Sequence, residues 1–363
     1  MALTNFRKET SERSDDANWT KELLLEKSGF HLDSIEGCNQ NTQNLVTHLM
    51  ERARVDHIDG VKSSLEEVVH QITLLEGSDS LIRKISFAKC FGLPLHYVLY
   101  SDEDERVYLL AFHSLTEVEI VKTFISYQLF ADWIASVKGW KSTKSFREMD
   151  DLPYFDQTLR KAGTPWPTNI DCFISDRNNV PVGVLEFQNA KNTKVVAHCN
   201  NDFFLCKLKN TSPEGKEIYH DDIRRWTSQE IIRVQSNLRF FVLTWAQKEG
   251  DVMLKEVDKI AIPYFEQIGH NINWSHMRTY KRDMHMYVTS NRSDQARKKI
   301  EESYKTYELN YVGRVMNIRI NNFPLSIDQK TFPSLYYKSK LLCIEGKNSL
   351  ISSFQELVNV PSL

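Results

Sequence analysis

The stretch 167–188 limits the possible folds of this chain more than any other part of the sequence. Two apolar runs rich in β-branched and aromatic residues, 170–175 and 180–187, stand on either side of a polar Asp/Asn cluster. Such an arrangement predicts a β-hairpin whose loop is formed by the polar cluster. With a four-residue loop, the pairing places Asp171 directly opposite Glu186. We therefore expect an antiparallel strand pair with two acidic residues across from each other.

Side chains alternate between the faces of a strand, so Glu186 and Gln188 share one face while Leu185 and Phe187 share the other. Two opposed carboxylates repel each other, by roughly 1 kcal/mol at about 4 Å in water and by about 4 kcal/mol near a protein surface. A Mg²⁺ ion would convert this repulsion into chelation, because Mg²⁺ binds one or two carboxylates together with water and phosphate. Two alternatives need no metal: the register differs by one residue, or one acid faces solvent.

The pattern of Asp171 followed, after fourteen residues, by Glu-Phe-Gln at 186–188 resembles the signature of the PD-(D/E)xK nucleases in its ExQ form. The segments that follow are similar in order to the ββαβ core of that family, with a helix predicted over 221–238 and an apolar strand at 240–245. Two features differ from the signature. An isoleucine stands directly before Asp171, and Gln188 takes the place of the usual lysine.

The resemblance implies a restriction-endonuclease-like fold and a Mg²⁺-dependent endonuclease of the restriction or phage-defence type, acting on phosphodiester bonds in double-stranded DNA. Asp171 and Glu186 would bind the metal, and Mn²⁺ could substitute for Mg²⁺. Gln188 would position the attacking water through its amide. Lys191 or Lys194 would supply the positive charge of the missing lysine.

Two other interpretations stay open. Gln188 cannot be protonated, which favours a catalytically inactive nuclease-fold module that binds nucleic acid without cutting it. An RNA endonuclease would use the same metal chemistry on a different substrate.

Several residues near the predicted hairpin could contact the nucleic acid, namely Arg224, Arg225, Lys194, His198 and Asn201. Arginine forks suit phosphate, and a helix start beside the active strands can direct N–H groups at a phosphate. Alternatively, the two arginines pair with Asp221, Asp222 or Glu230 on a solvated face, and His198 is a structural hydrogen-bonding residue. The net charge of −2 argues against binding of nucleic acid over the whole surface but allows a local basic cleft.

Strands that alternate with helices predict an α/β fold with a mixed central sheet flanked by helices. The predicted organisation has three parts. These are a helical N-terminal region at 1–94 with a loose tail, an endonuclease-like catalytic core at 95–265, and a DNA-contacting C-terminal α+β extension at 266–363.

Apolar spacing and capping signals predict helices before the hairpin at 44–54, 63–75, 80–91 and 116–134. A second hairpin is predicted from strands at 95–100 and 106–112, joined by an acidic turn. No internal repeat is visible in the sequence.

With 363 residues, 41% of them hydrophobic and 26% charged, the chain is long enough for two or three domains and has the composition of a soluble protein. No apolar run reaches the roughly eighteen residues of a membrane span, and the polar start lacks a signal peptide, which predicts a cytoplasmic protein without membrane contact. Six cysteines without a CxxC pair predict buried free thiols and no zinc site. A homodimer is compatible with this function, because dimers usually bind symmetric duplex sites.

Overall fold

The structure is a computed structural model that describes residues 5–8, 29–58, 61, 64–142, 152–190, 207–211, 213, 217–220, 223–246, 251–261 and 334–343. Several of the predicted features lie outside the described residues. They are Lys191, Lys194, His198, Asn201, Asp221, Asp222 and most of the C-terminal extension.

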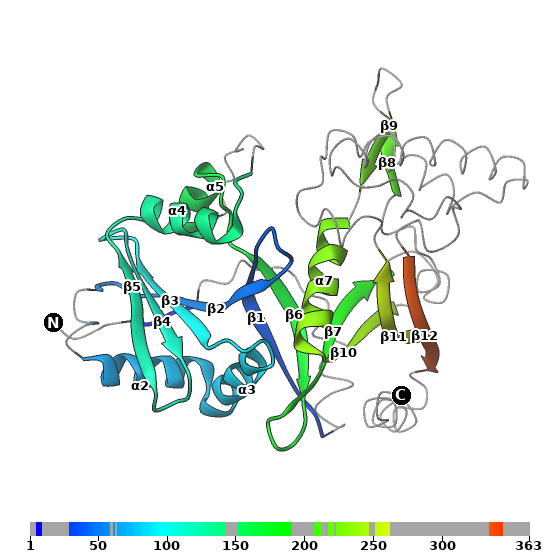
Figure 1. The fold of residues 1–363 in the computed structure, drawn as a ribbon, viewed down its shortest axis with the longest axis horizontal. Coiled ribbons are helices and arrows are strands. Elements are labelled where there is room, and N and C mark those ends of the chain that lie inside the picture. Colours follow the sequence, from blue (N-terminus) through cyan, green and yellow to red (C-terminus); the bar gives the residue numbers. More distant parts are fainter. Residues whose placement is uncertain are drawn as a thin grey trace, which may run out of the picture.

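A mixed sheet of ten strands forms the centre of the described part of the chain (Figure 1). Its strand order is β12-β11-β10-β7-β6-β1-β2-β3-β4-β5. These strands are β1 (His31–Gln40), β2 (Val46–Arg54), β3 (Leu95–Ser101), β4 (Arg106–Phe112), β5 (Val118–Phe124), β6 (Thr168–Ser175), β7 (Pro181–Asn189), β10 (Arg239–Ala246), β11 (Asp251–Ala261) and β12 (Ser334–Cys343). The described helices are α2 (Leu65–Glu76), α3 (Ser78–Lys89), α4 (Tyr127–Lys138), α5 (Tyr154–Lys161) and α7 (Ile223–Ser236). Strands β8 (Lys207–Thr211) and β9 (Glu217–His220) pair separately. The predicted α/β class, a mixed central sheet flanked by helices, is confirmed.

The hairpin predicted from the stretch 167–188 consists of β6 and β7. Cys172 lies opposite Leu185, and continuing the same register by one residue places Asp171 opposite Glu186. The predicted four-residue loop is wrong: Ser175 pairs with Pro181, and a β-bulge between Ile174 and Ser175 shifts the register by one residue. Asp176 Oδ1 stabilises the loop by accepting hydrogen bonds of 2.9 and 2.8 Å from two of its backbone N–H groups. The predicted pairing of the two acids is therefore confirmed.

The helix predicted at 221–238 is α7, and the strand predicted at 240–245 is β10. β10 runs parallel to β7, with Val242 level with Glu186, and antiparallel to β11 on its other side. A parallel neighbour requires a crossover connection, and α7 lies within it. β10 has a strand on each side, and its run from Phe240 to Leu243 is buried throughout, as predicted for a central strand.

The helix predicted at 44–54 is wrong, because this segment forms β2. Its apolar residues Val46, Leu49, Met50 and Ala53 are all buried, in a spacing that also fits one face of a helix. A strand that is covered on both faces lacks a clear alternation, so periodicity alone cannot distinguish it from a helix. The parallel pairing of β2 with β3 shows that this segment is a strand.

The helix predicted at 116–134 is also wrong in its first half. Residues 118–124 form the edge strand β5, which pairs with β4. The helix α4 begins only after Ser126, whose Oγ accepts a hydrogen bond of 3.3 Å from the backbone N–H of Leu129. The capping signals at the start of 116–134 therefore do not begin a helix, and Ser126 is the N-cap.

The predicted helical region 1–94 contributes two strands to the central sheet. The helices predicted at 63–75 and 80–91 are confirmed as α2 and α3, and the hairpin predicted after residue 94 is confirmed as β3 and β4. However, β1 pairs with β6 and β2 pairs with β3. This region therefore shares one sheet with the segments expected to form the catalytic core.

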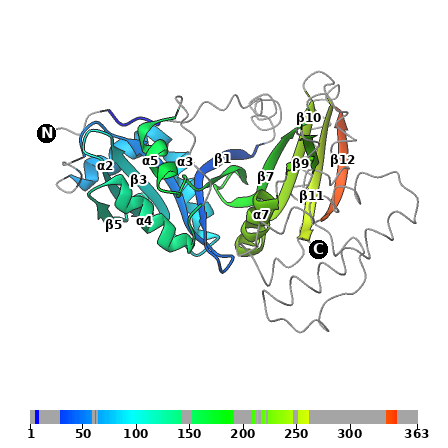
Figure 2. The ribbon, with the colours of Figure 1, turned by 90° about the horizontal axis from the view of Figure 1, so that it is seen from above.

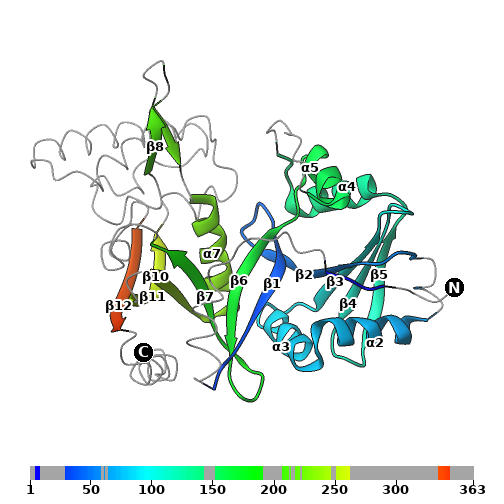
Figure 3. The ribbon, with the colours of Figure 1, turned by 180° about the vertical axis from the view of Figure 1, so that it is seen from behind.

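Helices cover both faces of the sheet on the side of β1 to β5. Figures 1 and 3 show α2 and α3 on one face and α4 and α5 on the other. The α2/α3 face belongs to a large apolar core that continues under α7, through Ile231, Ile232 and Val242. The second face has its own aromatic core, in which Tyr100 stacks on Phe155 with 4.2 Å between ring centroids. Helix α7 and the strands beneath it are therefore packed on the same core as α3.

Two composition-based predictions can be compared with the described residues. Cys38 and Cys172 are buried free thiols, as expected. Among the described helices, none combines the length and the apolarity that crossing a membrane requires.

Candidate functional site

Two carboxylates from neighbouring strands converge under α7. Asp171 lies on β6 and Glu186 lies on β7, at opposed positions of the hairpin. The side chain of Asp171 is 19% exposed, and that of Glu186 only 4%. The two acids therefore share a half-covered position in which one carboxylate is almost fully removed from water.

Arg225 of α7 lies between these two carboxylates. Its Nη2 is 2.6 Å from Asp171 Oδ2 and also contacts Glu186 Oε1. Glu230, one of the acids considered as its partner from the sequence, pairs instead with Arg233 at 2.8 Å. Arg225 is thus a member of the carboxylate site, a role that the sequence analysis did not assign to it.

Two amide side chains complete the polar contacts of the site. Gln229 Nε2 donates a hydrogen bond of 3.0 Å to Glu186 Oε2, and Asn169 Nδ2 donates one of 2.8 Å to Asp171 Oδ1. The sequence analysis missed both residues. Their spacing could have indicated them, since Gln229 lies one helical turn after Arg225 and Asn169 lies two residues before Asp171 on the same strand face.

Ionisation of Glu186 is unfavourable in this site. Burial raises the pKa of Glu186 well above its ordinary value of 4.5, and the nearby Asp171 carboxylate raises it further. The Arg225 guanidinium lowers this pKa, but less than the other two effects raise it. Ionisation of both acids at once therefore requires more positive charge nearby than the guanidinium of Arg225 provides.

Gln188 follows Glu186 by two residues on the same face of β7. Its Oε1 is buried and has no hydrogen-bond partner among the described residues. A buried amide oxygen without a partner is unfavourable by about 1–3 kcal/mol, so such groups usually accept from a protein donor or a water. The oxygen is chemically suited to hold a water beside the carboxylates.

The donor set fits a magnesium ion. Asp171, Glu186 and Gln188 offer hard oxygen atoms, which Mg²⁺ prefers, and Mg²⁺ usually takes one or two carboxylates and completes its shell with water and phosphate. In the part of the chain that the structure describes, no group of three or more His, Cys, Asp or Glu side chains is arranged to hold a metal. The fit is therefore that of a two-carboxylate site. The Arg225 side chain, which is 39% exposed, lies where the cation would be.

Of the other residues predicted to contact nucleic acid, the structure describes the backbone position of one. Arg224 belongs to the first turn of α7, directly before Arg225. Lys191, Lys194, His198 and Asn201 lie outside the described residues. Of the predicted set, the structure brings together Asp171, Glu186 and Arg225, with Gln188 adjacent along β7.

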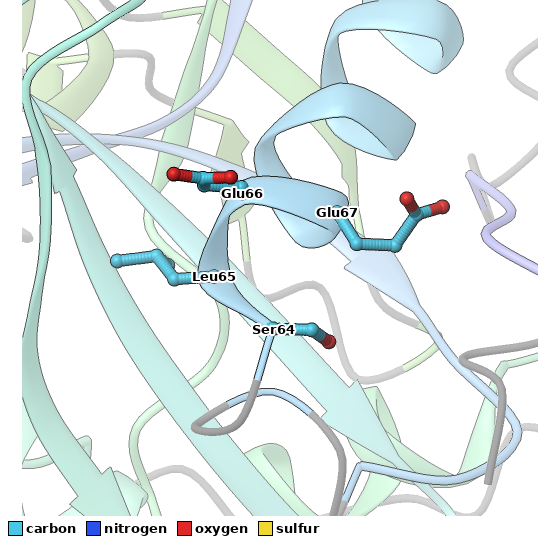
Figure 4. Close-up of a pocket in the computed structure, with 4 residues that line it drawn as sticks. All are labelled: Ser64, Leu65, Glu66 and Glu67. Carbon is cyan, nitrogen blue, oxygen red and sulfur yellow. The ribbon is translucent and has the colours of Figure 1, made fainter.

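A separate hollow of about 480 Å³ lies at the start of α2, lined by Ser64, Leu65, Glu66 and Glu67. Figure 4 shows the side chains of Glu66 and Glu67 pointing away from each other. They do not converge on a common position, so this hollow lacks the arrangement found between β6, β7 and α7.

The raised pKa of Glu186 predicts a pH-dependent effect of the substitution Glu186→Gln on stability. A carboxyl whose folded pKa is raised favours the folded state while protonated, and that contribution is lost as the pH rises from the unfolded pKa through the folded pKa. Glutamine stays neutral and has no such loss. Without divalent cations, we expect the variant to gain stability relative to the wild type as the pH increases. Denaturant unfolding of both proteins between about pH 4 and pH 9 measures this difference; a constant difference would contradict the raised pKa.

The chain was compared with family models, curated proteins and solved structures, and none of them matches.

Proposed function

We propose that this protein is a Mg²⁺-dependent endonuclease that hydrolyses phosphodiester bonds in duplex DNA. The main support is the geometry of Asp171 and Glu186, which are held opposite each other on β6 and β7 and can both ionise only with more positive charge than Arg225 provides. The parallel strand β10 and the crossover helix α7 beside them are compatible with the predicted nuclease-like core. This combination suits a cation and a phosphate better than a purely structural ion pair.

In this proposal each described residue has a separate task. Asp171 and Glu186 would hold the ion, with Asn169 and Gln229 fixing the orientation of their carboxylates by hydrogen bonds. When bound, the ion would polarise the scissile phosphate and lower the pKa of a water. Gln188 would orient the attacking water through its free Oε1.

Arg225 would change partners when substrate binds. Its guanidinium is a rigid fork that suits phosphate oxygens as well as carboxylates. Once the carboxylates are compensated by the ion, Arg225 is available to bind the phosphate and offset its growing negative charge. Lys191 and Lys194, which follow β7 in the chain, are proposed to add positive charge there.

The reaction consumes only water. The water oxygen forms a bond to phosphorus, one P–O ester bond breaks, and the released alkoxide takes up a proton from the water. The products are a strand end with a phosphate and a strand end with a hydroxyl group. No oxidant, reductant or nucleotide is required.

Wild-type protein incubated with duplex DNA provides the direct test. We expect cleavage in the presence of Mg²⁺ or Mn²⁺ and none in the presence of EDTA, because two opposed carboxylates cannot activate water without the ion. Calorimetric titration with Mg²⁺ should show binding in the same buffer. Cleavage that persists in EDTA would contradict the proposed site, and cleavage of RNA in preference to DNA would change the substrate class.

A DNA-binding module without catalytic activity is the alternative that the site itself favours. Gln188 stands at the position of the usual lysine, and Arg225 already pairs with both carboxylates. A protein of this kind would bind duplex DNA without Mg²⁺ and would not cut it. DNA affinity together with undetectable Mg²⁺ binding in calorimetry would support this alternative.

A further inference from the structure

The two halves of the central sheet have the same order of parallel and antiparallel strand pairings, counted from the middle of the sheet outwards. In its order β12-β11-β10-β7-β6-β1-β2-β3-β4-β5, the strands β6 and β1 form the middle, as Figure 3 shows. In Figure 2, β1 lies between β3 and β5 on one side and β7, β10, β11 and β12 on the other. The set β1 to β5 contains an antiparallel hairpin, a helical crossover to a parallel strand, and two further antiparallel strands. The set β6, β7, β10, β11 and β12 has the same pairing pattern.

The two sets meet in a way that an approximate two-fold axis would produce. β1 and β6 pair antiparallel, with Ile35 opposite Ile170. Helix α3, from the first set, contacts β7 of the second, and α7 of the second contacts β2 of the first. One of the latter contacts is the 2.7 Å hydrogen bond that the backbone N–H of Val46 donates to Gln235 Oε1. The chain is therefore built like two subunits of a symmetric dimer joined into one polypeptide.

The repeat also places a second pair of carboxylates. Gly37 lies opposite Met50 in the β1–β2 hairpin, so the next pair in that register is Glu36 and Glu51. These two residues are 15 positions apart along the chain, the same spacing as Asp171 and Glu186. We call Glu36 and Glu51 the N-terminal carboxylate pair, and Asp171 and Glu186 the C-terminal carboxylate pair.

Both carboxylate pairs lie on one face of the sheet. Helix α3 places Lys84 Nζ 3.0 Å from Glu51 and stacks Phe87 on Phe173 with 4.3 Å between ring centroids. Phe173 lies two residues after Asp171 and therefore on the same face of β6. The two pairs thus stand on either side of the two-fold axis, as the two active sites of a symmetric dimer would.

The N-terminal pair differs from the C-terminal pair because the chain itself supplies its cations. Lys8 Nζ lies 2.8 Å from Glu36, 2.5 Å from Glu51 and 2.5 Å from Glu76 of α2. Lys84 Nζ lies 3.0 Å from Glu51 and 2.7 Å from Glu76. The ammonium of Lys8 thus contacts three carboxylates at once and fills the position between them.

The two pairs differ in how many cationic side chains contact the equivalent residues Glu51 and Glu186. Burial alone would raise the pKa of Glu51, but Lys84 and Lys8 together lower it below its ordinary value. At the equivalent Glu186, the cationic contact comes from Arg225, whose side chain is 39% exposed and also contacts Asp171. Glu51, whose side chain is 0% exposed, is therefore enclosed by two lysines of the chain, whereas the C-terminal pair is bridged by one partly exposed arginine. An external cation would therefore bind weakly at the N-terminal pair and more tightly at the C-terminal pair.

We propose that this chain is an internal pseudo-dimer with one open site, at Asp171 and Glu186, and one closed site, at Glu36 and Glu51, so that it cuts one strand of a duplex in each binding event. The two strands of DNA are themselves related by two-fold axes, so two equivalent sites would cut both strands. With the second site closed by Lys8 and Lys84, the product is a single-strand nick. This inference rests on the proposed nuclease function. It also removes the need for a homodimer.

Supercoiled plasmid DNA distinguishes a nick from a double-strand break. With protein in substoichiometric amount and Mg²⁺ present, we expect open-circular plasmid to accumulate first and linear plasmid to follow only from later, independent nicks. Linear plasmid that forms from the start, in step with loss of the supercoiled form, would overturn the one-open-site inference alone. Absence of any cleavage would overturn the proposed function, and the inference with it.

Matched variants of the two pairs test which site acts. We expect Glu186→Gln to slow nicking by at least about a hundredfold and Glu51→Gln to leave it within about twofold, compared on folded protein. Because Glu51 is fully buried, Glu36→Gln serves as a second variant, since the side chain of Glu36 is partly exposed and tolerates change better. An equal loss of nicking in the N-terminal variants, with unchanged melting curves, would show that both sites cut and would overturn the inference.

Discussion

The substitution Asp171→Ala should lower the rate of Mg²⁺-dependent DNA cleavage by at least about a hundredfold. Asp171 is the more exposed of the two site carboxylates and hence the one that an ion from solvent reaches first. Without it, a single carboxylate remains, and Mg²⁺ affinity falls together with the charge that holds the ion. The measurement is the initial rate of cleavage with saturating DNA at several Mg²⁺ concentrations.

The fold should survive this change. Arg225 keeps its contact with Glu186, and removal of Asp171 also removes the repulsion that contributes to the raised pKa of Glu186. A matched control is Asp176→Asn, which removes a negative charge from the same hairpin and retains the oxygen that accepts the loop hydrogen bonds. The control should cleave DNA like the wild type. If Asp171→Ala cleaves at the wild-type rate, the site is not catalytic.

The effect of Mg²⁺ and DNA on the contacts of Arg225 distinguishes an endonuclease from a binding module without catalytic activity. In an endonuclease, its guanidinium moves from the carboxylates to the substrate phosphate, so both Mg²⁺ and DNA should weaken its contact with Asp171. In a binding module without catalysis, the contact of 2.6 Å would remain in place. The sequence placed Arg225 near the phosphate and did not foresee its contact with the carboxylates.

The local part of the site could be predicted from the sequence because it depends on a short loop. Five residues, 176–180, connect β6 and β7, and Ser175 pairs with Pro181, one residue away from the predicted register. A β-bulge between Ile174 and Ser175 restores the predicted register for the rest of the hairpin. The opposition of Asp171 and Glu186 follows from this restored register. The roles of Arg225 and Gln229 depend instead on where the crossover helix α7 is packed on the sheet, which no local pattern determines.

The repeat could not be recognised from the sequence for a similar reason. Glu36 and Glu51 have the spacing of Asp171 and Glu186, but β2 is buried on both faces and its apolar spacing imitates a helix. Once 44–54 is interpreted as a helix, no hairpin remains around Glu36 and Glu51. Parallel pairing of β2 with β3, a contact across the whole α2–α3 segment, is what identifies it as a strand.

The substitution Lys84→Met should lower the free energy of unfolding by about 3–5 kcal/mol, because breaking a buried ion pair leaves an uncompensated charge behind. The side chain of Lys84 is 7% exposed, and those of Glu51 and Glu76 are 0% and 3% exposed. Lys8 alone would then face three carboxylates. Methionine has a similar length, so the loss would come from the charge and not from a cavity. Denaturant unfolding measures the change.

The pH dependence of this loss gives a second check on its cause. The lysines lower the pKa of Glu51, and the resulting stability is present above the unfolded pKa and is lost as the pH falls through the folded pKa. The difference between the wild type and Lys84→Met should therefore shrink in acid. Lys89→Met, at an exposed position of the same helix, should change stability by less than about 0.5 kcal/mol at any pH. If Lys84→Met costs no more than this control, the N-terminal carboxylates are not closed by built-in cations, and a solvent cation could reach them as readily as it reaches Asp171 and Glu186.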